Sequence, residues 1–461
     1  MKITKIKLNS YLHFKKGLEI ALTYPEGHQK AGQPLDRVCL LGQSGTGKTT
    51  LLHLIKYFAC EGLAFNRTGI DDGAFVKDGV ELSYRIDGKD CSKSSAGDQQ
   101  FQHFDCADVS NPKAVDAYVK SWKETINYLL QQSTPLLISF PFSLVKPDDS
   151  VSAEDAKSLN EETGELEIIL DSRRVWDFDS STISLVWNIV FSRVEQYRKE
   201  FREKMAEHFS KMREETEHAV EIMKDFKAWE ESHPNPLKEL ADGCLADLLK
   251  NFHLEVETDL LKYQNDSLPN RKQIKVIIRS KTSGLEIPYK FLSTGTKQVL
   301  LTAIPLFYLH PKNSLILFDQ PETSLYPNIQ YMLPEIYQKS AGDTNQYFFA
   351  THSPIVASAF DPWEVVELEF QDDGSVKRKE YFHGESRTVN SYDIVPKLLR
   401  WDSSYRILFD VEEEGNEGRR KALMELASLE GRIKGSPDGE EKTRLIQDYK
   451  SLAKKLDWQI E

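Results

Sequence analysis

A glycine-rich segment near the N-terminus ends in a lysine and two threonines, a combination suited to binding phosphate groups. It comprises Gly42, Gln43, Ser44, Gly45, Thr46, Gly47, Lys48, Thr49 and Thr50, and residues 42–49 fit the pattern G-x-x-x-x-G-K-[ST]. Glycines here let backbone N–H groups close around phosphate oxygens, and the start of a following helix adds partial positive charge. In such a loop Lys48 contacts the β- and γ-phosphates and Thr49 holds a magnesium ion. The segment predicts a nucleoside triphosphate site.

A carboxylate follows an apolar run in the second half of the chain. Residues 315–318 (L-I-L-F) predict a buried strand that ends at Asp319. A strand of this kind delivers its acid beside a phosphate loop, where the carboxylate orders magnesium and its water. This is the Walker B arrangement, and Gln320 and Glu322 come directly after it.

Two shorter motifs accompany this pair. Ser293, Thr294 and Gly295 precede a predicted helix, so that hydroxyl and N–H groups point out at its positive end. His352 ends a predicted strand in the segment T-H-S-P, where it could act on a phosphate or be an ordinary hydrogen-bonded histidine.

The patterns around these motifs predict an α/β fold. Strands are expected at 38–41, 136–140, 314–318 and 346–350, and helices at 50–59, 297–309 and 328–340. Strands that alternate with helices indicate a mostly parallel sheet. Further strands are expected at 2–8, 18–23, 80–86, 274–278 and 287–291.

A long helical pattern separates the two halves. Apolar residues recur every three or four positions from 183 to about 229, which predicts one helix of about 45 residues and 65–70 Å. They are Trp187, Val190, Val194, Tyr197, Phe201, Met205, Phe209, Met212, Thr216, Ala219, Met223 and Phe226. Pro234 and Pro236 end it, and a second helix is expected at 236–252. The pattern predicts a protruding arm, with an ordinary packing helix as the alternative.

Composition limits the class of protein. The chain has 461 residues, a net charge of −13, five cysteines without a C-x-x-C spacing, and no apolar run long enough to span a membrane. We expect a cytoplasmic protein with no membrane partner. One basic segment is either the solvated face of a strand or a phosphate-binding stripe; it contains Arg271, Lys272, Lys275, Arg279 and Lys281.

The motifs together resemble those of ABC-type ATPases of the SMC, RecF and OLD group. Residues 318–322 (F-D-Q-P-E) and 325–327 (L-Y-P) resemble the D-E-P-E…L-H-P segment of that group. Residues 292–298 resemble its L-S-x-G signature, and residues 350–354 resemble its switch histidine segment. The resemblance implies a P-loop NTPase of ABC-ATPase type, with an antiparallel β lobe and an inserted coiled-coil-like helical arm.

On this resemblance the chain divides into four parts. The N-terminal part of an ATPase head covers 1–180 and the helical insertion 181–265. The C-terminal part of the head covers 266–411, and a charged helical segment covers 412–461.

The resemblance also implies how the site works. ATP and Mg²⁺ would lie in the seam of a head-to-tail dimer, with Ser293, Thr294 and Gly295 of one copy against the γ-phosphate held by the other. Thr49 and Asp319 would hold the metal, and His352 would sense or stabilise the γ-phosphate. The family's magnesium-binding glutamine matches any of four candidates, namely Gln99, Gln100, Gln131 and Gln132.

One departure from the family pattern concerns catalysis. The family places a glutamate after the Walker B aspartate as the base, whereas this chain has Gln320, whose amide can orient water but cannot accept its proton. We therefore expect an ATPase that turns over slowly, with Glu322 acting as the base as the lesser alternative.

Size and layout resemble the stand-alone ATPase subunits of bacterial anti-phage systems, such as AriA of PARIS and PtuA of Septu. That resemblance implies a multimeric sensor or scaffold that controls a separate effector nuclease of Toprim or HNH type, triggered by a phage protein or DNA. Two alternatives stay open, a RecF-like repair ATPase that clamps DNA and a non-hydrolysing structural subunit.

Overall fold

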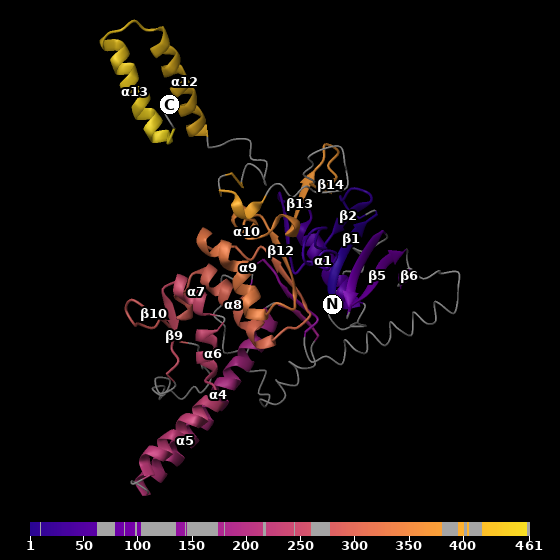
Figure 1. The fold of residues 1–461 in the computed structure, drawn as a ribbon, viewed down its shortest axis with the longest axis vertical. Helices are drawn as coiled ribbons and strands as arrows, with labels where there is room; N and C mark the ends of the chain where they lie inside the picture. Colours follow the sequence, from indigo (N-terminus) through magenta and orange to yellow (C-terminus); the bar gives the residue numbers. More distant parts are fainter. Residues whose placement is uncertain are drawn as a thin grey trace. The chain divides into compact units, whose positions relative to one another are not determined.

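The computed structural model divides into two compact units, residues 1–399 and 400–461, drawn in Figure 1. The structure describes residues 1–9, 11–61, 79–86, 88–96, 99–102, 135–142, 144, 174–178, 180–214, 218–243, 245–259, 277–379, 395–400, 403–404 and 417–458. The residues predicted to form the nucleotide site all lie in the first unit.

A seven-stranded sheet forms the centre of this unit, and every neighbouring pair is parallel except β13 and β14. Its order is β14 (Val376–Arg378), β13 (Val365–Phe370), β3 (Arg37–Gly42), β12 (Gln346–Thr351), β11 (Leu315–Asp319), β7 (Leu137–Phe140) and β8 (Val175–Asp177). This confirms the predicted α/β fold. Because Asp319 pairs with Ala350 and Thr351 with Leu41, the carboxyl ends of three strands meet at one edge.

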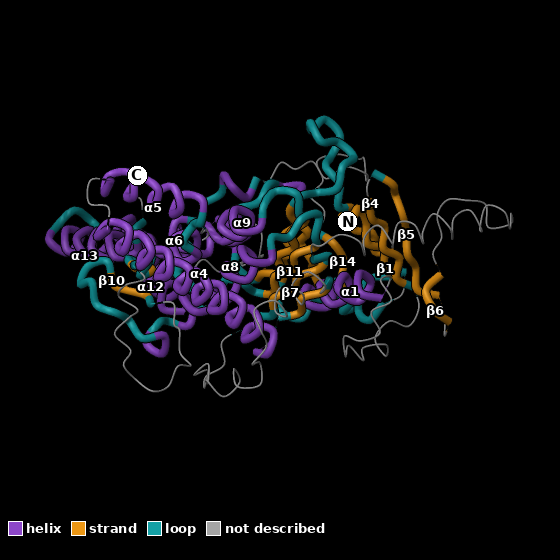
Figure 2. The backbone as a smooth tube through the Cα atoms, turned by 90° about the horizontal axis from the view of Figure 1, so that it is seen from below, coloured by secondary structure: helices purple, strands orange, loops and turns teal. Residues whose placement is uncertain are grey.

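Helices cover both faces of this sheet, which explains why its strands are almost continuously apolar. Helix α1 (Lys48–Glu61) shares a buried core with Leu317 and Phe348. Side chains one residue further along point to the other face, where Phe318 stacks on Tyr337 of α9 (Pro327–Ala341) at 4.7 Å. Helix α8 (Thr294–Leu309) packs against α9, on the opposite side of the strands from α1 (Figure 2).

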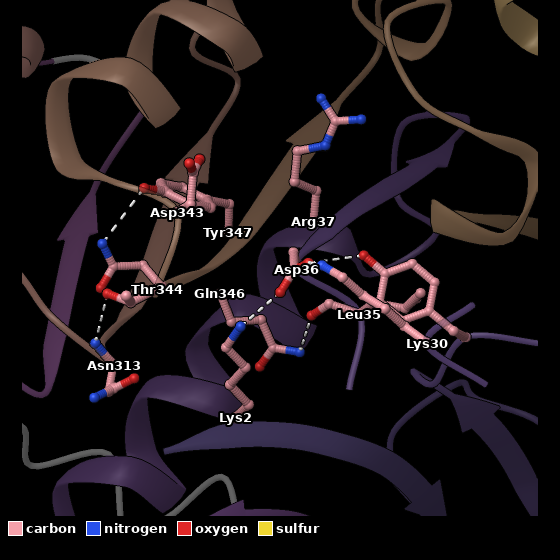
Figure 3. Close-up of polar contacts among 12 residues, drawn as sticks. Lys2, Lys30, Leu35, Asp36, Arg37, Asn313, Asp343, Thr344, Gln346 and Tyr347 are labelled. Atoms are coloured by element: carbon pink, nitrogen blue, oxygen red, sulfur yellow. Dashed lines mark hydrogen bonds and ion pairs between the residues drawn. The ribbon is translucent and has the colours of Figure 1, made fainter. Parts of the chain in front are cut away.

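A five-stranded antiparallel sheet supplies the predicted β lobe. Its order is β2 (Leu18–Ala21), β1 (Lys2–Leu8), β4 (Val80–Ile86), β5 (Lys89–Ala96) and β6 (Gln99–Gln102). Gln346 joins this lobe to the central sheet, because its amide accepts from the Ile3 N–H at 2.6 Å and donates to the Ile3 carbonyl at 2.9 Å. It also donates to the Leu35 carbonyl at 2.9 Å (Figure 3). One buried side chain therefore satisfies backbone groups of two segments.

The single long helix predicted from residue 183 to about 229 is wrong. The pattern divides into α4 (Ser180–Glu214) and α5 (Ala219–Ser232), and α5 folds back along α4. Tyr197 stacks on Trp229 with ring centroids 6.0 Å apart, and Phe201 meets Phe226 edge-on at 5.7 Å. The hairpin therefore lets the two apolar faces cover each other around Tyr197 and Phe201, whereas Phe209 and Met223 remain exposed.

The connection from this hairpin to the signature differs from the sequence prediction at two places. The helix expected at 236–252 divides at Gly243 into α6 (Pro236–Asp242) and α7 (Ala246–Asn251). The strand expected at 287–291 is wrong, because a 3₁₀ helix (Tyr289–Phe291) follows Pro288, which lacks the N–H that a strand ladder needs. β9 (Leu254–Val256) instead pairs with β10 (Ile278–Ser280), while residues 274–276 lie outside the described part.

The second unit is a helical hairpin. Helices α12 (Glu417–Gly435) and α13 (Glu440–Leu456) pack through Leu426, Ala453 and Leu456. Within the described residues of the chain, no helix is both long and apolar enough to cross a membrane.

Candidate nucleotide site

The predicted phosphate loop connects β3 to α1 and is shaped by its glycines. The φ angles of Gly42, Gly45 and Gly47 are +149°, +88° and +87°, in the region that side chains rarely adopt. A Cβ on Gly42 would lie 2.4 Å from the Leu368 carbonyl oxygen, and one on Gly47 would lie 2.5 Å from the ring of Phe14. The loop therefore keeps a backbone surface that residues with side chains could not form, as phosphate binding requires.

Other loop residues support this shape. Thr46 is buried, and its hydroxyl donates to the Gln43 carbonyl at 2.9 Å. Gln43, Ser44 and Gly45 are exposed, while Thr49 and Thr50 lie half-buried in the first turn of α1.

Lys48 occupies the centre of the site with only 4% of its surface exposed. Its ammonium donates to the Gly42 and Gln43 carbonyls at 2.8 and 2.9 Å and lies 3.3 Å from Nδ1 of His352. The role of Nδ1 in this contact depends on the imidazole tautomer, and the Gly42 backbone is a second hydrogen-bond partner of His352. Burial lowers the pKa of Lys48 to about 8 against the opposing effect of Asp319, and burial with the Lys48 charge lowers that of His352.

Thr49 and Asp319 meet directly, as the Walker B prediction requires. The Thr49 hydroxyl lies 3.1 and 3.0 Å from the two carboxylate oxygens of Asp319. Burial raises the pKa of Asp319, so this carboxylate gains from a nearby cation. One hydroxyl and one carboxylate, beside a loop built for phosphate, fit the hard oxygen ligands that Mg²⁺ prefers. These two residues would hold the ion.

The segment after Asp319 turns sharply. Gln320 has a φ of +48°, donates its N–H to the Ala350 carbonyl at 2.8 Å and is partly exposed. Glu322 is buried, and one of its oxygens accepts from the Thr351 hydroxyl at 2.6 Å and from the His352 N–H at 3.2 Å. Burial raises the pKa of Glu322. Glu322 therefore links the Walker B segment by hydrogen bonds to the end of β12, where His352 lies.

The signature turn begins α8. The Ser293 hydroxyl caps this helix by accepting from the Thr296 N–H at 3.1 Å. Ser293 and Thr294 are exposed, whereas Gly295 is buried, and a Cβ on it would lie 2.4 Å from the Ser324 carbonyl oxygen. The turn thus presents polar groups to solvent at a helix N-terminus while its backbone packs on the Walker B segment.

The structure brings Lys48, Thr49, Asp319, Glu322 and His352 together through direct contacts. Of the four candidate glutamines, the structure describes the backbone of two. Gln99 and Gln100 belong to β6 of the antiparallel lobe, and Gln131 and Gln132 lie outside the described residues.

Sequence reasoning missed several residues that support the site. Phe14 closes over Gly47, and the imidazole of His13 lies beside it with a buried Nε2 that has no hydrogen-bond partner. Gln330 and Ser353, joined at 2.6 Å, link α9 to the segment after His352. Only the position of Ser353 within T-H-S-P could have indicated its role, because the other contacts join residues far apart in the sequence.

Comparison with known proteins identifies the family. No curated protein matches the chain in sequence. Similar solved structures include the SMC head domain from Thermotoga maritima, with 13% identity, a TM-score of 0.37 and coverage of 82% of this chain and 98% of that one. Another is the Smc head domain with an extended coiled coil bound to the C-terminal domain of ScpA, from Pyrococcus furiosus, with 12% identity, a TM-score of 0.38 and coverage of 82% and 96%. The model of the AAA ATPase domain (AAA_15) matches residues 1–357. The chain therefore belongs to the AAA ATPase domain family.

Proposed function

We propose that this protein is an ABC-type ATPase whose site is completed by a second copy of the same chain. The observation that carries the proposal is the separation of two phosphate-binding elements. The phosphate loop already surrounds Lys48, while Ser293 and Thr294 stand exposed on another helix and make their contacts within their own turn. A helix N-terminus with exposed polar groups offers an anion site, and a neighbouring protomer would supply the anion.

The residues of one chain would divide the work at this site. Bound ATP and Mg²⁺ supply the phosphoanhydride to be cleaved and the cation that neutralises it. Lys48 would turn from its carbonyl contacts to hold phosphate oxygens, and Thr49 and Asp319 would hold the metal. His352 faces the same position, because its Nδ1 lies 3.3 Å from the Lys48 ammonium. Gln320 orients water without accepting its proton, which favours slow turnover and a long-lived closed dimer.

Dimer formation tests the proposal. We expect Ser293→Arg to leave the ATP affinity of the monomer within about threefold, because the residue does not contact its own phosphate loop. The same change should abolish ATP-dependent dimers in mass photometry. Lys48→Ala should abolish nucleotide binding altogether. Ser232→Arg, at an exposed serine that ends α5, is the matched control and should dimerise like the wild type. Dimers of Ser293→Arg that form normally with ATP would refute the composite site.

We further propose that this dimer acts as a sensor or scaffold subunit that controls a separate effector nuclease in anti-phage defence. Support comes from the glutamine at position 320, which suits a stable ATP-bound state better than a motor. Purification of the native complex tests this role, and a co-purifying Toprim or HNH nuclease is the expected result. A complex that contains no effector would contradict it.

The DNA-clamping alternative has less support. Arg279 of the basic segment forms an ion pair with Glu257 at 2.7 Å and donates to the Gly284 carbonyl, so it is engaged within the protein. Arg271, Lys272 and Lys275 lie outside the described residues.

A further inference from the structure

A continuous series of contacts joins the phosphate loop to the signature turn of the same chain. It passes through Gln330, a residue of α9 that lies in neither element. We propose that Gln330 is a positioning residue that adjusts the signature turn to the phosphates held by Lys48. The inference deepens the proposed function and rests on it, because the signature turn matters only if it serves a second protomer.

The first link joins Gln330 to the segment that contains His352. The Ser353 hydroxyl donates to the Gln330 Oε1 at 2.6 Å and accepts from the N–H groups of Ile355 and Val356 at 3.2 and 3.3 Å. The proton and both lone pairs of this hydroxyl are therefore used, which fixes its position. Any movement of Ser353 must move Gln330 or break a short, partly buried hydrogen bond.

The second link joins Gln330 to the Walker B segment. Its Nε2 donates to the Leu325 carbonyl at 2.8 Å. This carbonyl can only accept, so the amide orientation is fixed and Oε1 is left for Ser353. The Leu325 N–H in turn donates to the Glu322 carbonyl at 3.1 Å. Gln330 thus bridges two segments that each end at the nucleotide site.

The third link is packing without free space. A Cβ on Gly295 would lie 2.4 Å from the Ser324 carbonyl oxygen and 2.8 Å from Cδ2 of Leu325. The backbone of the signature turn therefore rests directly on residues 324–325. Close-packed groups transmit displacement, so a shift of Leu325 must shift Gly295 and the exposed Ser293 beside it.

The phosphate end of the series is set by Lys48. Its ammonium lies 3.3 Å from His352, which precedes Ser353, and it must turn from the Gly42 and Gln43 carbonyls to contact a phosphate. Glu322 also contacts the His352 segment, because it accepts a hydrogen bond from the His352 N–H. Its charge, however, interacts with those of Asp319 and Lys48. Gln330 makes no such contact, which makes it the residue that can test the connection without disturbing the loop.

Hydrogen exchange of the full-length monomer tests the proposal. The measurement compares residues 293–297 with ATP–Mg²⁺ and with ADP–Mg²⁺, at a protein concentration where mass photometry shows monomers. In the wild type we expect exchange rates to differ about fivefold between the two nucleotides, within the range typical of coupled sites. Gln330→Leu removes both hydrogen bonds and should reduce the difference to less than about twofold.

Two further variants separate positioning from general stability. Gln330→Glu keeps the acceptor for Ser353 but loses the donor to Leu325, so it should also lose the ATP–ADP difference in exchange rate. This variant provides the test if Gln330→Leu fails to fold. Gln338→Leu changes a glutamine of the same helix whose amide contacts Asp343 at the surface, and it should retain the difference. ATP affinity should stay within about threefold in every variant.

Several results would overturn the proposal. The first is an ATP–ADP difference in exchange rate that is as large in Gln330→Glu as in the wild type. The second is the absence of that difference in the wild type. The third is a variant that loses ATP affinity together with the difference in exchange rate. A failure of the wild type to dimerise with ATP would instead refute the proposed function, because the exchange comparison uses monomers only.

Discussion

Replacing Gly47 by alanine tests how the phosphate loop is built, because Gly45 provides a matched position. The φ angles are +87° and +88°, so each alanine would carry the same backbone strain of about 1–2 kcal/mol. The surroundings differ. The new Cβ at Gly47 would lie 2.5 Å from Cζ of Phe14, whereas at Gly45 it would meet Phe370 at an ordinary 3.5 Å. Phe14 is only 5% exposed, so its ring cannot simply turn away.

The expected difference follows from this overlap. Overpacking of a buried site costs about 1–3 kcal/mol, so Gly47→Ala should lower the free energy of unfolding by that much more than Gly45→Ala. Phe14→Leu removes the overlapping ring atoms and should recover about 1–3 kcal/mol in the double variant, as a positive coupling in a double-mutant cycle. Urea unfolding followed by circular dichroism provides the measurement. Equal losses for the two alanine variants, or no coupling to Phe14, would refute this account of the loop.

Three other predictions concern catalysis, pH dependence and the joining of the two sheets. Gln320→Glu should raise kcat at saturating ATP by about 10²–10⁴-fold if only the base is missing, and unchanged phosphate release would place the base elsewhere. Burial alone would raise the pKa of Asp36, but hydrogen bonds from Lys2 and Lys30 at 2.6 Å outweigh it and lower that pKa (Figure 3). The stabilisation is therefore present above the unfolded pKa near 3.8 and lost below it. Asp36→Asn should cost about 1–2 kcal/mol at pH 7 and progressively less in thermal melts as the pH falls below 4, and a pH-independent loss would contradict this. Gln346→Leu leaves buried backbone groups of two segments unpaired and should lower stability by about 3–6 kcal/mol in urea unfolding, whereas a loss under about 1 kcal/mol would show that water replaces the amide.

The parts of the site that the sequence predicted are those with local causes. The loop at 42–49 is recognisable because each of its glycines adopts a positive φ angle that the shape of the loop requires. Asp319 was placed correctly because its strand is a continuous buried run, and parallel pairing brings its end to β3 and β12. Ser293 was expected before a helix from 297, and α8 begins earlier, at Thr294, directly after it.

The parts that the sequence could not predict depend on contacts between distant segments. The apolar spacing of α4 continues into α5 without a change of period, so nothing in the pattern indicated that the two helices fold against each other. The pairing of Gln330 with Ser353, or the position of Phe14 over Gly47, joins residues that no local rule connects. At Pro288 the local rule was available, and the alternating apolar residues were given too much weight.

Backbone strain in the Walker B segment supports the view that this segment has a functional shape. Gln320 and Ser324 both have positive φ angles, +48° and +63°, which cost about 1–3 kcal/mol each in residues other than glycine. Such conformations persist only where surrounding contacts determine them. Here the Thr323 N–H and hydroxyl both donate to the Gln320 carbonyl, and Gly295 packs on the Ser324 carbonyl. The conformation of Gln320 is therefore held by contacts with Thr323 and with Ala350 of β12, and the signature turn packs against the second strained residue, Ser324.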